Sequence, residues 1–158
     1  MTASSEAAQP AQVAWKRVDI AGAGISIDHH PAWATLAAER LVYQRFSNEG
    51  TVSVRWGDDA TVDGALATTG VEGGAKRKIE SDAATTVGGM AARRLVLRVT
   101  AAEARTHDLR AQDRERIYVF VGLDAGHGHV LVGYRSPASE LAAVEPLLEH
   151  VLASVKRL

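Results

Sequence analysis

The chain has 158 residues, which fits one domain, and a formal net charge of −1 with acidic and basic residues interspersed. It contains no cysteine, which excludes disulfides, thiolate chemistry and cysteine-based zinc sites. The balanced charge gives no electrostatic case for nucleic acid or an anionic membrane, and no apolar run is long enough for membrane insertion.

The N-terminal residues 1–12 are small and polar, and we expect a disordered tail followed by one folded domain over residues 13–158. This lead lacks the basic and hydrophobic regions of a secretory signal. We therefore expect a cytoplasmic protein, unless an export signal has been removed from the chain.

The first half of the chain predicts strands separated by turns, at residues 25–28, 41–46 and 51–56, with residues 13–20 as a further candidate. Residues 33–40 predict a short helix, and Thr61 is a candidate cap for another over residues 62–69. Gly22 and Gly24 lie in a turn that lacks the strand, helix and acidic residue of a dinucleotide fingerprint.

The second half predicts further strands at residues 90–100, 117–121 and 130–134, with residues 76–86 as another candidate. Gly88-Gly89 is turn chemistry, and the charged residues 101–115 are expected to form a long exposed loop. About six strands in sequence without a βαβ rhythm predict an α+β protein with a twisted antiparallel sheet.

The C-terminal residues predict a helix packed across one face of that sheet. Ser136-Pro137 is a helix-start signal, and Pro146 falls inside the helical pattern, where it lacks an N–H and clashes with the preceding turn. We therefore expect a short helix near residues 139–144, a break or kink, and a main helix from Pro146 to the end. The apolar positions of the helix are Leu141, Val144, Leu148, Val151, Leu152 and Val155.

The order of motifs over residues 25–158 resembles a known group of proteins. A strand ends in His-Pro-x-Trp at His30, a Gly-x-x-Ala-x-Arg pattern runs from Gly88 to Arg93, and a hairpin ends in Gly-Tyr-Arg-Ser-Pro at Pro137. This order is similar to that of the PsbP-like α/β/α sandwich group, which includes DcrB-like bacterial proteins, EagR-type secretion chaperones and the Ran-binding nuclear import factors. DcrB-like members often carry a lipobox cysteine, which this chain lacks.

The positions that the resemblance matches are structural ones. They are Gly89 for a turn, Pro137 for a cap and Ser154 near the helix end. The group shares no catalytic residues. It therefore implies a bacterial accessory or binding protein, chaperone-like in character, more readily than an enzyme.

The histidines suggest two chemical alternatives. His127 and His129, completed by His29 and His30, could hold a metal, and His107 beside Asp108 could be an acid–base pair. Both sets also fit solvated loops, and the sequence has no Gly-x-Ser-x-Gly elbow or Walker spacing. We therefore assign no catalytic, metal or cofactor-binding residues and expect no cofactor.

Our leading hypothesis is a non-catalytic adaptor that recognises a protein partner and is itself a monomer or weak homodimer. Its possible partner surface is aromatic, and its members are Trp33, Tyr43, Trp56, Tyr118 and Tyr134. The tryptophans also fit a buried core, and the basic clusters at residues 76–78 and 93–94 fit solvated strand edges. The alternatives are a small-ligand pocket between sheet and helices, and a histidine-dependent metal protein or hydrolase.

Overall fold

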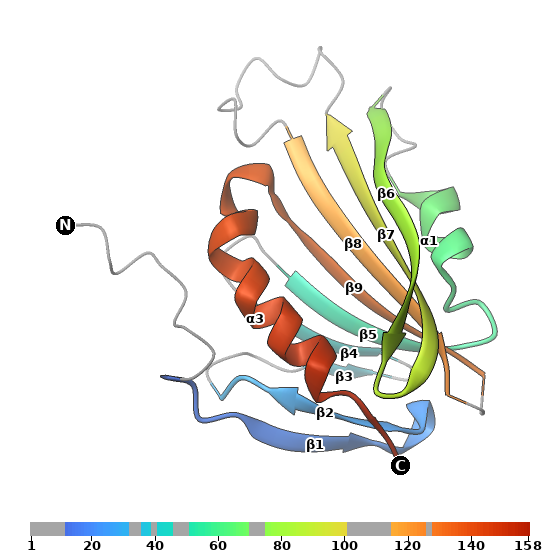
Figure 1. Ribbon diagram of the computed structural model, residues 1–158, viewed down its shortest axis with the longest axis vertical. Helices are drawn as coiled ribbons and strands as arrows, with labels where there is room; N and C mark the ends of the chain where they lie inside the picture. Colours follow the sequence, from blue (N-terminus) through green and yellow to red (C-terminus); the bar gives the residue numbers. More distant parts are fainter. Residues whose placement is uncertain are drawn as a thin grey trace.

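The computed structural model describes residues 12–31, 36–38, 41–45, 51–69, 75–100, 115–125 and 128–158. Their strands form two antiparallel sheets, which confirms the α+β class with an antiparallel sheet (Figure 1). No helix in this described part of the chain is long and apolar enough to cross a membrane. The expected tail, apart from Gln12, and the expected loop at residues 101–115, apart from Glu115, lie outside the described residues.

The larger sheet has seven strands in the order β3-β4-β5-β9-β8-β7-β6. These strands are β3 (Leu36–Ala38), β4 (Leu41–Arg45), β5 (Thr51–Gly57), β6 (Lys76–Val87), β7 (Met90–Thr100), β8 (Glu115–Asp124) and β9 (His129–Pro137). The antiparallel pairs β4–β5 and β8–β9 are the hairpins expected for these segments, and β6 pairs with β7 across the predicted turn at Gly88-Gly89.

A smaller sheet of three strands packs beneath it, in the order β1-β2-β10. Its strands are β1 (Lys16–Ile20), β2 (Ile25–His29) and β10 (Lys156–Arg157), and the short helical turn η3 (Ala21–Ala23) joins the first two. The C-terminal residues therefore return to pair with β2, close to the beginning of the fold (Figure 1).

The two faces of the large sheet are covered by different elements. Side chains alternate between the two faces along β8, so Val119 and Val121 point toward helix α3 (Leu141–Ser154) and the small sheet, where the main core lies. Phe120 points the other way, into a second core with helix α1 (Val62–Thr68). Gly122 permits this contact, because a Cβ there would lie 2.9 Å from Cγ2 of Val62.

The predicted cap at Thr61 and the predicted turn at Gly88-Gly89 are confirmed. The hydroxyl of Thr61 accepts the backbone N–H of Gly64 at 3.0 Å, which caps α1 as predicted. Gly88 and Gly89 join β6 to β7 with φ angles of 58° and 77°. Both angles are the left-handed values that a two-residue hairpin turn requires.

The helix predicted over residues 33–40 is wrong where the structure describes it. Residues 36–38 form the strand β3, in which Leu36 lies opposite Tyr43 of β4. Alanine-rich segments favour helix locally, but an open sheet edge beside the segment supplies backbone partners that outweigh this preference.

The predicted division of the C-terminal helix at Pro146 is also wrong. Helix α3 runs unbroken from Leu141 to Ser154, and a helical turn, η5 (Ala138–Glu140), precedes it. Pro146 is exposed, whereas Leu148 and Val151 beneath it are buried, so packing outweighs the cost of the proline. The Ser136 hydroxyl donates to the Pro137 carbonyl at 2.9 Å and caps no helix.

Candidate functional site

Strand β6 forms an open edge of the large sheet. It is 12 residues long, all of them exposed except Val87, and among the described strands it pairs only with β7. Its sequence lacks the apolar alternation of a strand with one covered face. An exposed edge of this length presents backbone N–H and C=O groups that have no partner strand.

The register shows which backbone groups of β6 point outward. Val87 and Met90 close the two-residue turn, so they exchange both hydrogen bonds, and bonded pairs then recur at every second residue. Asp82, Ala84 and Thr86 fall at the alternate positions and present their N–H and C=O groups to the open edge. A register shift between Ile79 and Ser81 interrupts the ladder, so the regular part of the edge begins at Ser81.

A groove lies beside this part of the edge, between the end of the β6–β7 hairpin and α3. Its volume is about 200 Å³. Val87, Val121 and Leu152 form its buried floor. Arg94 and Glu149 border it and bind each other through two hydrogen bonds of 3.0 and 2.6 Å. The remaining residues that line it are Thr85, Thr86, Gly88 and Ala153.

The arginines of β7 are neutralised by neighbouring carboxylates. Arg93 donates to both oxygens of Asp82, at 2.9 and 2.7 Å, and to Asp63 at 2.7 Å. Arg98 binds Glu80, and the hydrogen bond from Arg98 holds the pKa of Glu80 below its usual value. The cluster at residues 93–94 is therefore a set of ion pairs rather than a free basic patch.

The lysines of β6 are less engaged. The Nζ of Lys78 lies 3.9 Å from the Glu80 carboxylate, with 75% of the Lys78 side chain exposed, and Lys76 makes no ion pair within the described residues. Arg77 instead reaches α1, where it donates to the carbonyls of Leu66 and Thr69 at 2.5 and 3.1 Å. The start of β6 therefore keeps positive charge available to a ligand.

The structure separates two members of the predicted aromatic surface, Tyr118 and Tyr134. Tyr134 is 1% exposed and lies in the core beneath α3, so it cannot contact a partner. Burial raises the pKa of its hydroxyl to about 12. Tyr118 points to the opposite sheet face and stacks on Phe120 at 5.9 Å. Trp56 is half-buried against Gly22, while Trp33 and the side chain of Tyr43 lie outside the described residues.

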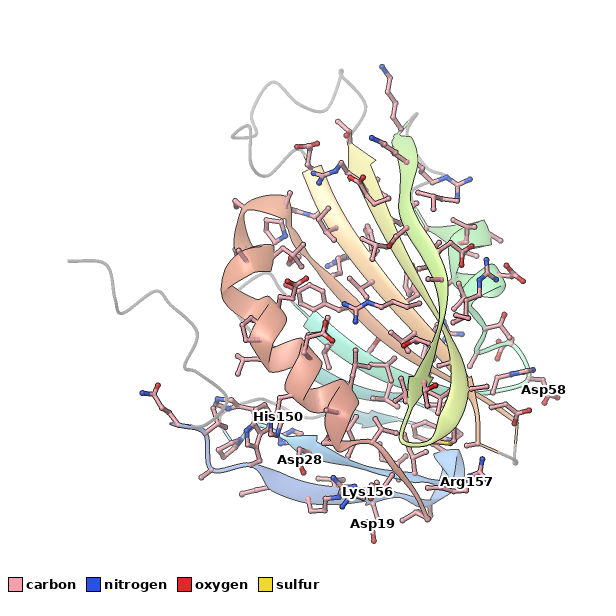
Figure 2. The ribbon with its side chains drawn as sticks, in the orientation of Figure 1. Asp19, Asp28, Asp58, His150, Lys156 and Arg157 are labelled. Carbon is pink, nitrogen blue, oxygen red and sulfur yellow. The ribbon has the colours of Figure 1, made fainter. Side chains whose placement is uncertain are left out.

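The histidines are separated as well. His29 ends β2 and His30 follows it. Trp15 meets the His30 ring edge-on at 5.7 Å and stacks on His150 at 4.1 Å. His129 begins β9 at the other end of the small sheet, near Asp58. Figure 2 shows Asp58 far from His150. Within the described residues no three histidine or acidic side chains could hold a metal, and His107, Asp108 and His127 lie outside them.

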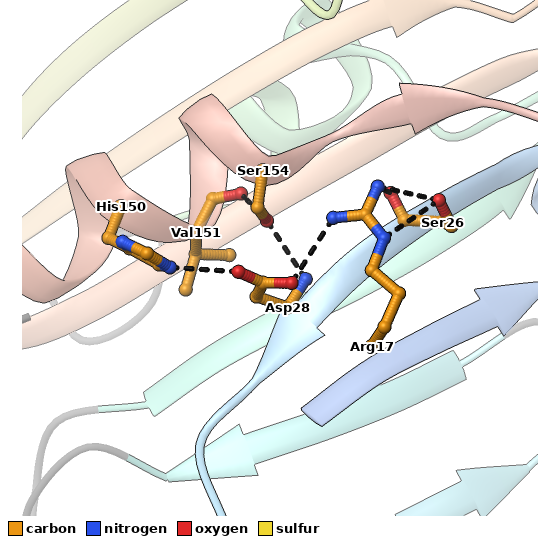
Figure 3. Close-up of polar contacts among 6 residues, drawn as sticks. All are labelled: Arg17, Ser26, Asp28, His150, Val151 and Ser154. Carbon is orange, nitrogen blue, oxygen red and sulfur yellow. Dashed lines mark hydrogen bonds and ion pairs between the residues drawn. The ribbon is translucent and has the colours of Figure 1, made fainter. Parts of the chain in front are cut away.

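A polar network that no sequence pattern indicates joins α3 to β2 (Figure 3). The Nε2 of His150 lies 2.8 Å from Asp28, whose other oxygen binds Arg17 at 3.2 Å. The Ser154 hydroxyl accepts the Asp28 N–H at 2.9 Å and donates to the Val151 carbonyl at 2.6 Å. Because this hydroxyl already uses its proton, Ser154 is not placed as a nucleophile, and the network fastens the helix to the sheet.

Acid is expected to weaken the fold through His29 and His30. Burial lowers the pKa of both imidazoles, and for His29 the charges of His30 and Lys16 lower it further. The contribution of these two neutral imidazoles to the free energy of unfolding is fully present above their unfolded pKa of about 6.5. It is lost as the pH falls from there toward their lower pKa values in the folded protein, because the unfolded chain then binds more protons than the folded one. Urea denaturation at pH 7.5 and 5.5 should show a smaller loss for a His29→Gln, His30→Gln variant. Equal losses in both proteins would contradict this assignment.

The architecture defines an α+β sandwich of the PsbP-like fold, which confirms the resemblance seen in the sequence. The chain is similar to cyanobacterial PsbP from Synechocystis sp. PCC 6803, with 13% identity over 91% of this chain and 92% of that one, and a TM-score of 0.66. It is also similar to the Ran-binding protein Mog1p of Saccharomyces cerevisiae, with 14% identity, coverage of 92% and 96%, and a TM-score of 0.60.

A third solved structure, PA94 from Pseudomonas aeruginosa, is 12% identical over 89% of this chain and 94% of that one, with a TM-score of 0.52. No family model matches the sequence, and neither does any curated protein. At these identities the likeness establishes the fold, and function has to be argued from the site.

Proposed function

We propose that this protein is a non-catalytic accessory module that binds a partner protein by accepting an extended segment of the partner along β6. The observation that carries this proposal is the regular, exposed edge from Ser81 to Thr86, with outward backbone groups at Asp82, Ala84 and Thr86. Main-chain hydrogen bonds to such an edge give affinity, and pockets beside it give specificity. The fold shared with a Ran-binding protein supports the view that the partner is a protein.

The two halves of β6 differ in a way that favours this use. Proteins protect exposed edges with lysines, other charges and bulges. The first half of β6 has all three, with Lys76, Lys78 and the register shift after Ile79. The half from Ala83 to Val87 has no charged side chain, so it remains able to pair with another strand.

Two proline substitutions in β6 distinguish an N–H group that points outward from one that is paired with β7. Thr86→Pro removes an N–H that points outward, so we expect it to lower the free energy of unfolding by less than about 1 kcal/mol. Thr85→Pro removes an N–H that pairs with Ala92, and we expect a loss of about 1 to 2 kcal/mol. Urea denaturation measures both values. Equal destabilisation by the two prolines would show that the edge is oriented differently.

Site-specific photocrosslinking in cells tests the function. With benzoylphenylalanine at Ala84, we expect one discrete protein adduct that is absent when the probe replaces Asp19, an exposed residue of β1. Adding Thr86→Pro to the Ala84 probe should abolish the adduct while the melting temperature stays close to that of the probe-bearing parent. Equal adducts at both positions, or an adduct that survives the proline, would contradict binding at this edge.

A small-ligand site is the second candidate function, and one cavity favours it. This cavity of about 300 Å³ lies between α1 and the β7–β8 strands, with Ala91, Gly122 and Leu123 among its apolar lining residues and Asp63 and Arg93 at its polar side. Its volume is at the small end of the range for ligand pockets. A small apolar compound that raises the melting temperature of the native chain, but not of Ala91→Leu, would support this alternative.

A further inference from the structure

The groove and the exposed lysines, Lys76 and Lys78, lie on the same face of β6. Thr85 lies opposite Ala92 and Lys78 lies opposite Arg98, and both of these β7 positions face α3, as Arg94 does. The register shift after Ile79 keeps this alignment, because the bulged residue restores the alternation on its far side. In a strand added to β6, the side chains on this face would therefore contact the groove near the end of β6. Side chains further from that end, on the same face, would contact Lys78 and Lys76 near its start.

The groove admits an uncharged side chain. Arg94 and Glu149 already satisfy each other, so a charged ligand group would have to break their paired hydrogen bonds. The rest of the lining is the Thr85 side chain, Gly88 and Ala153 above an apolar floor. A side chain such as Val or Thr matches this combination in size and polarity.

The beginning of β6 favours carboxylates. Lys76 and Lys78 are exposed, whereas Glu80 and Asp82 of the same strand are held by arginines of β7. Opposite charges on paired strands contribute roughly 0.2 to 1 kcal/mol per pair, and like charges directly opposite destabilise by a similar amount. The charge that is free for a partner on this stretch is therefore positive.

We infer that the partner segment is an extended, acidic peptide that pairs antiparallel with β6, which is the more stable arrangement of two strands. It places an uncharged side chain in the groove beside α3, and carries Asp or Glu about six and eight residues later, opposite Lys78 and Lys76. This inference rests on the proposed function, because it names the chemistry of the segment bound at the same edge.

Synthetic peptides test this chemistry on the full chain. The probe is a strand-forming peptide of Ser and Thr with one Val near its N-terminus and two Glu at the spacing given above. Two control peptides replace both Glu by Lys, or reverse the order of the residues. Binding is followed through the NMR signals of the Ala84 and Thr86 amides, which point to the open edge.

We expect the Glu peptide to bind at least about tenfold more tightly than the Lys peptide. The difference should shrink at high salt and in a Lys76→Gln, Lys78→Gln variant, because both weaken the same charge pairing. The Thr86→Pro variant should bind neither peptide.

Each other outcome has a definite meaning. Equal affinity of the Glu and Lys peptides, with shifts at Ala84 and Thr86, overturns the acidic partner and leaves the edge as a binding site. Tighter binding of the reversed peptide overturns the antiparallel orientation. No shift at these amides with any peptide overturns the proposed function itself. Concentration-dependent self-association that Thr86→Pro abolishes identifies the occupant as a second copy of this chain and overturns the peptide inference.

Discussion

Replacing Pro146 by Ala is expected to stabilise the protein by about 2 to 3 kcal/mol. Pro146 is the sixth residue of α3, past the first turn, where a proline lacks its backbone hydrogen bond and its ring presses on the carbonyl four residues earlier. Alanine restores that bond to the Ala142 carbonyl, and a proline inside a helix costs about 3 kcal/mol relative to alanine. Because Pro146 is exposed, the change removes no core packing.

Equilibrium urea denaturation at neutral pH measures this gain. The matched control is Glu145→Ala, an exposed neighbour on the same helix, which should change the free energy of unfolding by no more than about 0.5 kcal/mol. A loss of stability in Pro146→Ala would mean that the helix is bent at this residue, and that the bend is needed for α3 to lie across the sheet.

Elements whose sequence signals lie within a few neighbouring residues could be predicted from the sequence. The cap at Thr61 and the glycine turn at residues 88–89 were predicted from a few neighbouring residues, because their chemistry is complete within a few residues. The predictions that were wrong concern segments whose structure depends on distant contacts. The strand β3 depends on β4, and the unbroken course of α3 through Pro146 depends on the core beneath it.

The exposed position of the candidate site, the outer edge of β6, depends even more on contacts with distant segments. Residues 76–86 were predicted as a strand, but nothing within them shows that no described strand pairs with their outer side. One signal was available: β6 has polar residues on both faces, whereas β7 places Leu95, Leu97 and Val99 together on one face. A strand without a consistent apolar face suits an edge rather than the middle of a sheet.

Two members of the predicted aromatic surface, Tyr118 and Tyr134, are separated for a related reason. Tyr118 and Tyr134 lie on different strands, so whether they share a face depends on the register of β8 against β9. In the observed register Tyr134 lies opposite Val119, which places it on the face away from Tyr118. No pattern within either strand specifies that register.

Replacing Gly88 by Ala is expected to lower the free energy of unfolding by at least about 3 kcal/mol, and replacing Gly89 by only about 1 kcal/mol. Both glycines have positive φ angles, and the left-handed conformation alone costs another residue roughly 1 to 2 kcal/mol. At Gly88 a Cβ would also lie 2.4 Å from the Val155 carbonyl oxygen, so the hairpin end would have to separate from the end of α3. At Gly89 a Cβ meets nothing within 4 Å.

The difference between the two variants isolates the contact between hairpin and helix, since the backbone cost is common to both. This contact borders the groove beside α3, so Gly88→Ala should also weaken peptide binding at β6, while Gly89→Ala should leave it unchanged. Asn tolerates the left-handed conformation better than Ala, so Gly89→Asn should be nearly neutral and Gly88→Asn should still unfold more easily. Equal losses at the two positions would show that the hairpin end does not rest on α3, and the groove would then lack the fixed wall that its proposed specificity requires.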